Sequence, residues 1–341
     1  MLEAVQETET GKGAAIFGCA GPVLTPDERA FYRDYQPFGF IIFARNVADP
    51  AQLRRLTHDL RDAVGRDAPI LVDQEGGRVQ RLRGPHWTEW TPPFDFVQAA
   101  GRNAAAAMAL RYRLIARELR SVGIDANCAP TADLITPATH PFLKNRCYGA
   151  DPAVVSAIAL AVAHAHLAEG VLPVVKHMPG HGRSEVDTHH DLPTVHATPA
   201  DLHAHDFAPF RALNQLPMAM TAHLVFAAYD SRPATQSPAM IRVIRDHIGF
   251  HGLLITDDLN MQALHGSLAS RAALSIAAGV DIALHCKGDL AEMQAVAAAA
   301  GDMPPATILR AQAALAARRP PDPVDIVQLQ ADLSAMMDPH A

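Results

Sequence analysis

The segment GFIIFARNVADPAQLRRLTHDLRDAVGRDAPILVDQ (39–74) contains one complete strand–helix–strand unit. Its two ends, GFIIFA (39–44) and ILVDQ (70–74), are short apolar runs of the kind found in strands that are covered on both faces. Between them, Asp49 can cap a helix in which Pro50 takes the first position. The apolar residues that follow at helical spacing are Leu53, Leu56, Leu60 and Val64.

The same alternation of a short apolar run and a longer amphipathic stretch occurs eight times along the chain. The runs are AAIFGCA (14–20), GFIIFA (39–44), ILVDQ (70–74), DANCAP (125–130), VLPVVKH (171–177), MAMTAHL (218–224), GLLITDD (252–258) and VDIALHC (280–286). Eight strand–helix repeats predict an α/β fold, a single (β/α)8 barrel of the TIM type. A doubly wound sheet is the alternative, but no G-x-G-x-x-G motif follows the first run.

No shift in composition marks a second domain. We expect one catalytic barrel domain over residues 1–341, with a barrel core at about 14–300. The only linker-like stretch is RRPPDPVD (318–325), and the residues after it are too few to form a domain. The C-terminal tail, at about 301–341, is therefore expected to pack on the barrel.

The composition excludes several classes of protein. Of the 341 residues, 49% are hydrophobic and 19% are charged, so the chain can bury a large core and is not mainly disordered. The net charge is −7 and no basic block occurs, which argues against nucleic acid as a partner. The four cysteines lie far apart without a C-x-x-C pair, which suits a reducing compartment better than a disulfide framework.

The N-terminal residues predict a soluble, cytoplasmic protein. Glu3, Glu7 and Glu9 stand where a signal peptide would carry positive charge. No apolar run approaches the ~20 residues that a membrane span requires, so we expect no membrane partner. We also expect a monomer, since no separate oligomerisation element is visible.

Polar residues gather where the predicted strands end, which is where barrel enzymes place their active sites. These residues are Asp73, Asp133, Lys176, His177, His223, Asp257 and Asp258. Two loops at the same mouth, 131–150 after the fourth strand and 178–193 after the fifth, are much longer than the usual ~2–6 residues. The second loop is expected to act as a mobile flap over the barrel mouth.

The flap contains Asp187-Thr188-His189. A carboxylate two residues from a histidine can accept the ring N–H and raise the basicity of the ring, which suits proton transfer near neutral pH. Asp257, at a strand end, is the natural partner, as a carboxylate nucleophile or an electrostatic stabiliser. Asp258 should point the other way if the strand continues, and is expected to cap the next helix.

We expect neither a metal nor another cofactor. His177 and His181 have the spacing of metal ligands, but Pro179 and Gly180 between them prevent a shared helical face. A metal-dependent amidohydrolase barrel, a reading from another class, would also use lysine, histidine and aspartate at strand ends. The H-x-H pair which that reading needs after the first strand is missing, because the chain has GCAGP (18–22) there.

Seven motifs follow one another between about residues 14 and 300. They are VDQEGGRVQRL (72–82), APTADL (129–134), NRCYGADP (145–152), KHMPGHG (176–182), DTH (187–189), MTAHL (220–224) and TDDLNM (256–261). Together they resemble glycoside hydrolase family 3, and more narrowly its single-domain bacterial branch, the β-N-acetylhexosaminidases of peptidoglycan recycling. Met178, Cys147 and Tyr148 depart from the residues usual in the family, which leaves the shape of the aglycone side open.

The resemblance implies a retaining exo-β-N-acetylglucosaminidase that removes the non-reducing terminal N-acetylglucosamine from 1,6-anhydro-muropeptides. Asp257 would be the nucleophile that forms a covalent glycosyl-enzyme, and His189, oriented by Asp187, would be the general acid/base. The family positions that bind the sugar hydroxyls correspond to Asp73, Arg81, Arg146, Lys176 and His177. A histidine in place of the second carboxylate departs from the usual scheme for retaining glycosidases, but its aspartate partner can keep it protonated until transfer.

Three further readings remain open at this level. A phosphorylase would release the sugar to phosphate instead of water. In substrate-assisted hydrolysis the 2-acetamido group would attack, with Asp257 and Asp258 as the adjacent carboxylates, although strand alternation argues against both facing the sugar. A non-catalytic sugar-binding barrel would bind without turnover.

Overall fold

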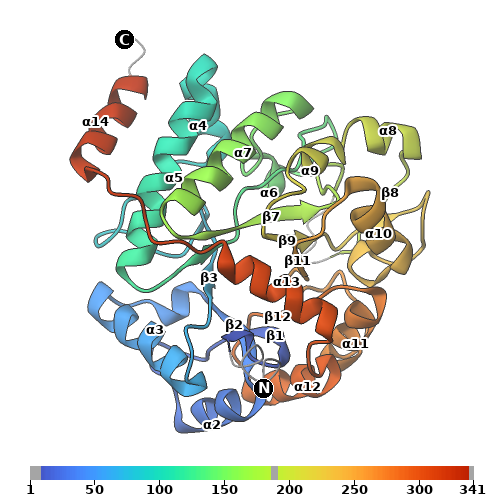
Figure 1. Ribbon diagram of the computed structural model, residues 1–341. Coiled ribbons are helices and arrows are strands. Elements are labelled where there is room, and N and C mark those ends of the chain that lie inside the picture. Colours follow the sequence, from blue (N-terminus) through green and yellow to red (C-terminus); the bar gives the residue numbers. More distant parts are fainter. Residues whose placement is uncertain (1–8, 186–190, 338–341) are drawn as a thin grey trace.

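The computed structural model describes residues 9–185 and 191–337, and their parallel strands form a barrel (Figure 1). The strand order is β11-β9-β7-β6-β3-β2-β1-β12, and an isolated parallel bridge between Ile255 and Ile282 joins the two ends of this order. The strands are β1 (Gly13–Gly18), β2 (Pro37–Ile42), β3 (Ile70–Val72), β6 (Ala126–Asn127), β7 (Leu172–Met178), β9 (Met218–Thr221), β11 (Leu253–Ile255) and β12 (Ala283–His285). Each overlaps one of the eight apolar runs, so the predicted barrel is confirmed.

Helices cover the outside of the barrel. They are α2 (Pro26–Tyr35), α3 (Pro50–Val64), α4 (Pro93–Ala100), α5 (Ala104–Ser121), α7 (Pro152–Ala168), α8 (Pro199–Ala204), α9 (Ala208–Ala212), α10 (Pro238–Arg242) with η4 (Val243–Ile248), α11 (Leu268–Ala278) and α12 (Leu290–Ala300). The strands therefore have protein on both faces, and every residue of β1, β2 and β7 is buried. Continuous rather than alternating apolar runs are what such strands require.

Asp49 and Pro50 begin helix α3, as the sequence predicts. The Asp49 side chain accepts a hydrogen bond from the amide of Gln52, and Pro50 is the first residue of α3. The helix ends at Gly65, which adopts the left-handed conformation that glycine favours (φ 65°). The predicted stripe of α3 is buried in full, at Leu53, Leu56, Leu60 and Val64.

Short helices and strands lie in the loops at the mouth of the barrel. The hairpin β4 (Gln74–Gly76) and β5 (Val79–Gln80) follows β3, α6 (Pro141–Lys144) lies in the loop before α7, and β8 (Thr194–Val195) pairs with β10 (Val225–Phe226). The two long loops are packed against each other. The Thr139 hydroxyl donates to the carbonyl of Gly182, where a Cβ would lie 1.8 Å from the carbonyl oxygen of Leu134. Only glycine permits this close approach of the two backbones.

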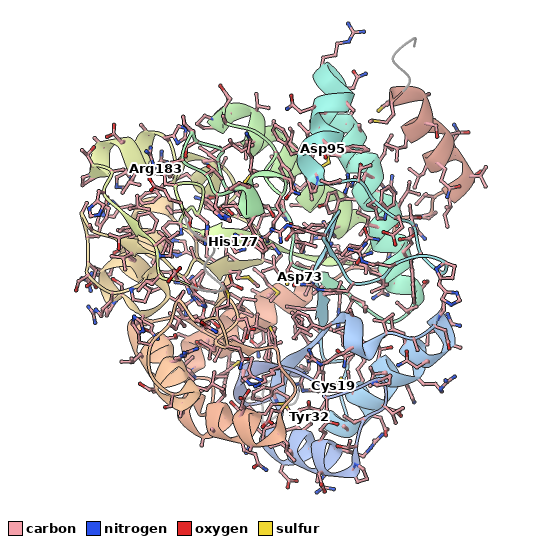
Figure 2. All side chains as sticks on the ribbon, turned by 180° about the vertical axis from the view of Figure 1, so that it is seen from behind. Cys19, Tyr32, Asp73, Asp95, His177 and Arg183 are labelled. Atoms are coloured by element: carbon pink, nitrogen blue, oxygen red, sulfur yellow. The ribbon has the colours of Figure 1, made fainter. Side chains whose placement is uncertain are left out.

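The C-terminal segment passes the opposite end of the barrel. Helix α13 (Pro305–Ala316) contacts β11, and α14 (Ile326–Met337) lies against α4 and α5 (Figure 1). Within the described residues, no helix is long and apolar enough to cross a membrane. Viewed from behind, Asp73 and His177 lie near the middle of the barrel, whereas Asp95 belongs to the outer layer on α4 (Figure 2).

Candidate active site

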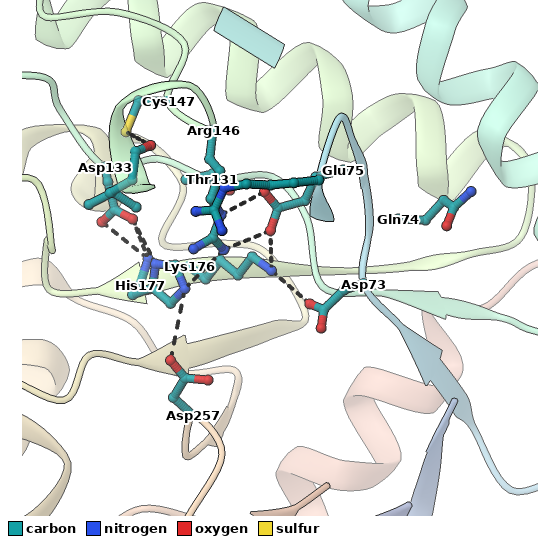
Figure 3. Close-up of polar contacts among 12 residues, drawn as sticks. Asp73, Gln74, Glu75, Thr131, Asp133, Arg146, Cys147, Lys176, His177 and Asp257 are labelled. Carbon is teal, nitrogen blue, oxygen red and sulfur yellow. Dashed lines mark hydrogen bonds and ion pairs between the residues drawn. The ribbon is translucent and has the colours of Figure 1, made fainter. Parts of the chain in front are cut away.

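A network of five charged side chains lies at the mouth, where β3 and β7 end, and four of them, Asp73, Glu75, Arg146 and Lys176, are labelled in Figure 3. The ammonium of Lys176, the fifth residue of β7, lies 2.9 Å from Oδ1 of Asp73 and 2.6 Å from Oε1 of Glu75. The guanidinium of Arg146 binds both oxygens of Glu75, at 2.9 Å through Nε and 2.8 Å through Nη2. Arg81 completes the set, with Nη2 2.9 Å from Oδ2 of Asp73. Two carboxylates are thus held by three cations.

The mutual attraction of these charges outweighs their burial. Burial alone would raise the pKa of Asp73, but the nearby charges of Lys176 and Arg81 hold it below its ordinary value. In the same way, Arg146 and Lys176 lower the pKa of Glu75 to about 2 despite its burial. Asp73 and Glu75 in turn raise the pKa of Lys176 against the effect of burial. All these groups are charged at neutral pH, so the cavity presents fixed donors and acceptors to a ligand.

His177 connects this network to a further carboxylate. Its Nδ1 lies 2.7 Å from Oδ2 of Asp133, which is fully buried, and its backbone amide also donates to that carboxylate. The contact of Nδ1 with Asp133 leaves Nε2 as the ring nitrogen that faces the cavity. Nε2 lies 3.9 Å from Oδ2 of Asp257 and 3.5 Å from Nη2 of Arg146. Asp133 therefore sets the orientation of the ring that faces the cavity.

Asp257 follows β11 by two residues, and its side chain reaches the cavity. Its Oδ1 accepts a hydrogen bond of 2.8 Å from the amide of Asp258. Burial raises the pKa of Asp257, but His177 and His223, together with that amide, lower it below its ordinary value. The carboxylate is ionised at neutral pH, as a nucleophile or an electrostatic stabiliser must be.

One cavity brings most of the predicted residues together. Its lining includes Asp73, Arg81, Arg146, Lys176, His177 and Asp257, with Asp258 and His181 beside them. The rest of its wall is more apolar and includes Ile41, Phe43, Phe142, Met220, Met261, Leu284 and Cys286. Charged groups on one part and apolar groups on another suit a ligand with both hydroxyls and a hydrophobic face. Asp187 and His189 lie outside the described residues.

Two sequence interpretations are corrected. Strand β11 ends at Ile255, so the alternation assumed for Asp257 and Asp258 does not apply, and both side chains line the cavity. Asp258 does not cap a helix, because α11 begins only at Leu268, after the cap Ser267. Its Oδ1 accepts from the amides of Asn260 and Cys286, so it closes the turn after β11.

His223 does not line the cavity. It is fully buried, with Nδ1 2.7 Å from the hydroxyl of Thr235 and Nε2 3.1 Å from the carbonyl oxygen of Asp258. His223, which the sequence placed among the polar strand ends, therefore stabilises the turn that carries Asp257 instead of facing the ligand. It contributes through its proximity to that carboxylate, whose pKa it helps to lower.

Glu75 is the residue that sequence reasoning missed. It is 1% exposed, and it holds both Arg146 and Lys176, which come from segments about 70 and 100 positions further along the chain. A signal was present in VDQEGG (72–77), where an acidic residue stands two positions after Asp73 at a strand end. No feature of the sequence indicates that its partners are these two cations.

Histidine pairs and cysteines show no metal centre within the described segments. His177 and His181 are neighbours, with ring centroids 5.3 Å apart, but no group of three potential protein ligands is assembled among residues 9–185 and 191–337. The four cysteines are buried and free, and burial raises the pKa of the Cys128 and Cys286 thiols well above the ordinary value. Buried thiols that stay protonated behave as small apolar side chains.

Comparison with known proteins gives this geometry a context. Residues 24–316 match the N-terminal domain of glycosyl hydrolase family 3. The chain is 36% identical to a β-hexosaminidase of Bordetella avium over 289 residues, which cover 82% of each chain, and 36% identical to one of Methylococcus capsulatus over 276 residues, which cover 80% of this chain and 82% of the relative.

Solved structures show the same likeness. NagZ from Neisseria gonorrhoeae superposes with a TM-score of 0.81 at 28% identity, covering 96% of this chain and 97% of that one. A family 3 β-N-acetylglucosaminidase from Paenibacillus gives a TM-score of 0.83 at 26% identity, covering 97% of this chain and 68% of that one. Because the family domain spans most of the chain and its relatives match over most of their own length, the chain belongs to glycosyl hydrolase family 3, as a NagZ-like β-N-acetylhexosaminidase.

Proposed function

We propose that the chain is a retaining exo-β-N-acetylglucosaminidase that removes the non-reducing terminal N-acetylglucosamine from 1,6-anhydro-muropeptides. It would do so as a cytoplasmic monomer in peptidoglycan recycling. The observation that carries the proposal is the ionised carboxylate of Asp257, which shares one cavity with a set of paired charges suited to sugar hydroxyls. The relatives named β-hexosaminidase support the sugar, and the family branch supports the recycling substrate.

In this mechanism Asp257 attacks the anomeric carbon. Its Oδ1 is held by the amide of Asp258, which leaves Oδ2, on the side of His177, as the attacking oxygen. The new bond from Oδ2 to carbon forms as the bond to the leaving oxygen breaks, and positive charge develops on the ring carbon and oxygen. Water then releases the sugar with the β-configuration retained.

Proton transfer is assigned to His189, with Asp187 as the carboxylate that orients and charges it. The protonated imidazole gives its proton to the leaving oxygen in the first step, and the neutral imidazole takes one from water in the second. Both residues lie outside the described part of the chain. The assignment rests on the D-x-H motif at residues 187–189 of the sequence.

The sugar hydroxyls are assigned to the charged network. Asp73 accepts from hydroxyls, whereas Lys176, Arg81 and Arg146 donate to them, and charge-assisted hydrogen bonds of this kind are the stronger ones. Because each group is already paired with a neighbour, its position is set before the substrate arrives. Such preorganisation lowers the cost of ordering the site during binding.

The test is covalent trapping. A fluorinated N-acetylglucosaminide that keeps the 2-acetamido group slows both steps, and the adduct is located by mass spectrometry of a proteolytic digest. We expect the added mass on the peptide that contains Asp257, and for Asp257→Ala a loss of at least about 10³-fold in kcat/KM with 4-nitrophenyl N-acetyl-β-glucosaminide. An active enzyme that gives no adduct, or Asp257→Ala that keeps its activity, would move the nucleophile elsewhere and favour attack by the acetamido group.

Product analysis tests the acceptor. Hydrolysis releases N-acetylglucosamine at the same rate with or without phosphate, whereas a phosphorylase would form the 1-phosphate when phosphate is added.

Membership of the family makes the metal-dependent amidohydrolase hypothesis wrong, and the named relatives make the hypothesis of a non-catalytic sugar-binding barrel wrong. The phosphorylase remains the alternative that this experiment decides.

A further inference from the structure

His181 lies in the same cavity, yet neither the charged network nor the proposed mechanism uses it. It is 6% exposed, lines the cavity together with His177 and Asp257, and its ring centroid lies 5.3 Å from that of His177. Its backbone amide donates to Oδ1 of Asp133 at 2.7 Å, so the residue is held in place through its main chain. The side chain is therefore positioned without using the ring.

The ring of His181 makes no hydrogen bond to any described residue. Its Nδ1 is buried and has no hydrogen-bond partner among residues 9–185 and 191–337. Two other buried histidines use both ring nitrogens: His166 contacts the carbonyl oxygen of Val162 and the side-chain amide of Asn127, and both ring nitrogens of His223 are bonded. Buried His285 also has an unpaired Nδ1, but its Nε2 lies 3.1 Å from Oε2 of Glu292. Proteins seldom leave a buried polar atom unpaired, and His181 lines the binding cavity, where a ligand can supply a partner for its ring.

The charge state of His181 limits which chemical groups of a ligand its ring can bind. Burial, together with the neighbouring His177, lowers its pKa to about 4. At neutral pH the ring is therefore neutral, with one N–H donor and one acceptor nitrogen. A neutral group that both donates and accepts matches an amide, which carries one N–H and one carbonyl oxygen.

The position of Asp257 indicates where an amide would lie. If Asp257 attacks the anomeric carbon, the substituent on the adjacent carbon, C2, must lie beside that carboxylate. His177 is the ring next to it, at 3.9 Å, but its Nδ1 is committed to Asp133. His181 is the second ring on the same side. We infer that His181 binds the 2-acetamido group of the substrate and so determines the preference for N-acetylglucosaminides over glucosides.

The inference rests on the proposed function in one respect, the placing of the anomeric carbon at Asp257, and the experiment separates the two. His181→Phe removes both ring nitrogens, and His181→Gln keeps a donor and an acceptor. His166→Phe is the matched control, since it removes a buried imidazole outside the cavity. For each variant, kcat and KM are measured with the 4-nitrophenyl β-glycosides of N-acetylglucosamine and of glucose, and glucose and N-acetylglucosamine are compared as inhibitors.

For His181→Phe we expect kcat/KM for the N-acetylglucosaminide to fall by about 10- to 100-fold, the effect of one or two hydrogen bonds. The loss should lie mainly in KM, because the acetamido contact exists in the bound substrate as well as in the transition state. The glucoside should change by less than about threefold. His181→Gln should recover part of the loss, and His166→Phe should leave the ratio of the two substrates unchanged.

An equal fall with both substrates, or no fall with either, would overturn the inference while leaving an adduct at Asp257 untouched. If His181→Phe does not fold, the wild-type enzyme still decides the matter. The ring nitrogen resonances of His181, assigned by their loss in His181→Gln, should shift when N-acetylglucosamine binds and should stay in place with glucose. Resonances that ignore N-acetylglucosamine at saturation would contradict the contact.

Discussion

Both ends of the barrel contain buried carboxylates that are paired with cations, but the two ends use them differently. At the end where strands begin, Asp125 precedes β6 and Asp281 precedes β12. Asp281 accepts from Arg245 at 2.6 Å, from Arg310 at 2.8 Å and from the hydroxyl of Thr307 at 2.9 Å. The contacts of Arg310 and Thr307 connect α13 to the barrel, and neither Asp125 nor Asp281 lines the cavity.

At the end where strands finish, Asp73 and Glu75 are paired just as closely with Lys176 and Arg146, yet these groups line the cavity. The pairing chemistry is the same, so a buried ion pair does not by itself mark an active site. What differs is the end of the strand: parallel strands bring their carboxyl ends to one mouth, where long loops leave space for a ligand.

Among the changes that compare the two ends, the largest effect on activity is expected from Glu75→Gln, which removes a charge from the mouth while keeping the shape of the side chain. Lys176 and Arg146 would then rely on the remaining carboxylate, and a shift of their side chains misplaces the sugar. We expect kcat/KM to fall by about 100-fold or more. The measurement is steady-state kinetics beside circular dichroism, and full activity in a folded variant would reduce Glu75 to a structural role.

Asp281→Asn is the matching change at the other end. It leaves Arg245 and Arg310 without their anionic partner, and breaking a buried pair in this way typically costs about 3–5 kcal/mol. Urea denaturation should show this loss in the free energy of unfolding. Activity per folded molecule should remain close to that of the wild type. If Asp281→Asn lost activity without losing stability, the conclusion that this end of the barrel serves the fold and not the site would be wrong.

Asp258 extends the comparison to a carboxylate at the mouth whose charged form lowers the stability of the folded protein. Burial raises its pKa to about 6, and the charge of Asp257 adds to the shift. In the unfolded chain an aspartate titrates near ~3.9, so this residue costs nothing below about pH 4. The cost grows as the pH rises from about 4 to 6, and it reaches about 2–3 kcal/mol above that range.

Asp258→Asn should therefore gain stability relative to the wild type between pH 4 and pH 7, measured by urea denaturation at each pH. Glu75→Gln is the control of opposite sign. The wild-type carboxylate of Glu75 has a lowered pKa, so its contribution to stability is present above about pH 4 and is lost as the pH falls towards 2. A pH-independent difference for Asp258→Asn would contradict the shift.

The smallest effect is expected from Arg310→Gln. The Arg310 side chain is 32% exposed, whereas that of Arg245, which binds the same carboxylate, is 13% exposed. Solvent weakens the outer pair, so its loss should cost about 1 kcal/mol or less in the free energy of unfolding. If Arg310→Gln lowered the free energy of unfolding as much as Arg245→Gln does, the prediction that solvent weakens the pair of Arg310 with Asp281 would be wrong.

Much of the fold could be predicted from the sequence because its signals are local. The apolar runs and the cap at Asp49 act within a few residues of where they stand, and each has the predicted role. The site was predicted in part for the same reason: Asp73, Lys176, His177 and Asp257 directly end or follow apolar runs, and the barrel brings strand ends together. The error at Asp258 arose because the sequence does not show that β11 ends at Ile255.

The sequence by itself determined that eight strand–helix units close into a barrel and which polar residues stand at the strand ends, because periodicity and capping depend on neighbours along the chain. Only the tertiary structure decided which charges are paired, that Glu75 holds Arg146 and Lys176, and that Nδ1 of His181 has no hydrogen-bond partner in the described part of the chain. Pairing depends on distances between segments far apart in the chain. The balance between burial and attraction that sets each pKa exists only when those segments have been packed together.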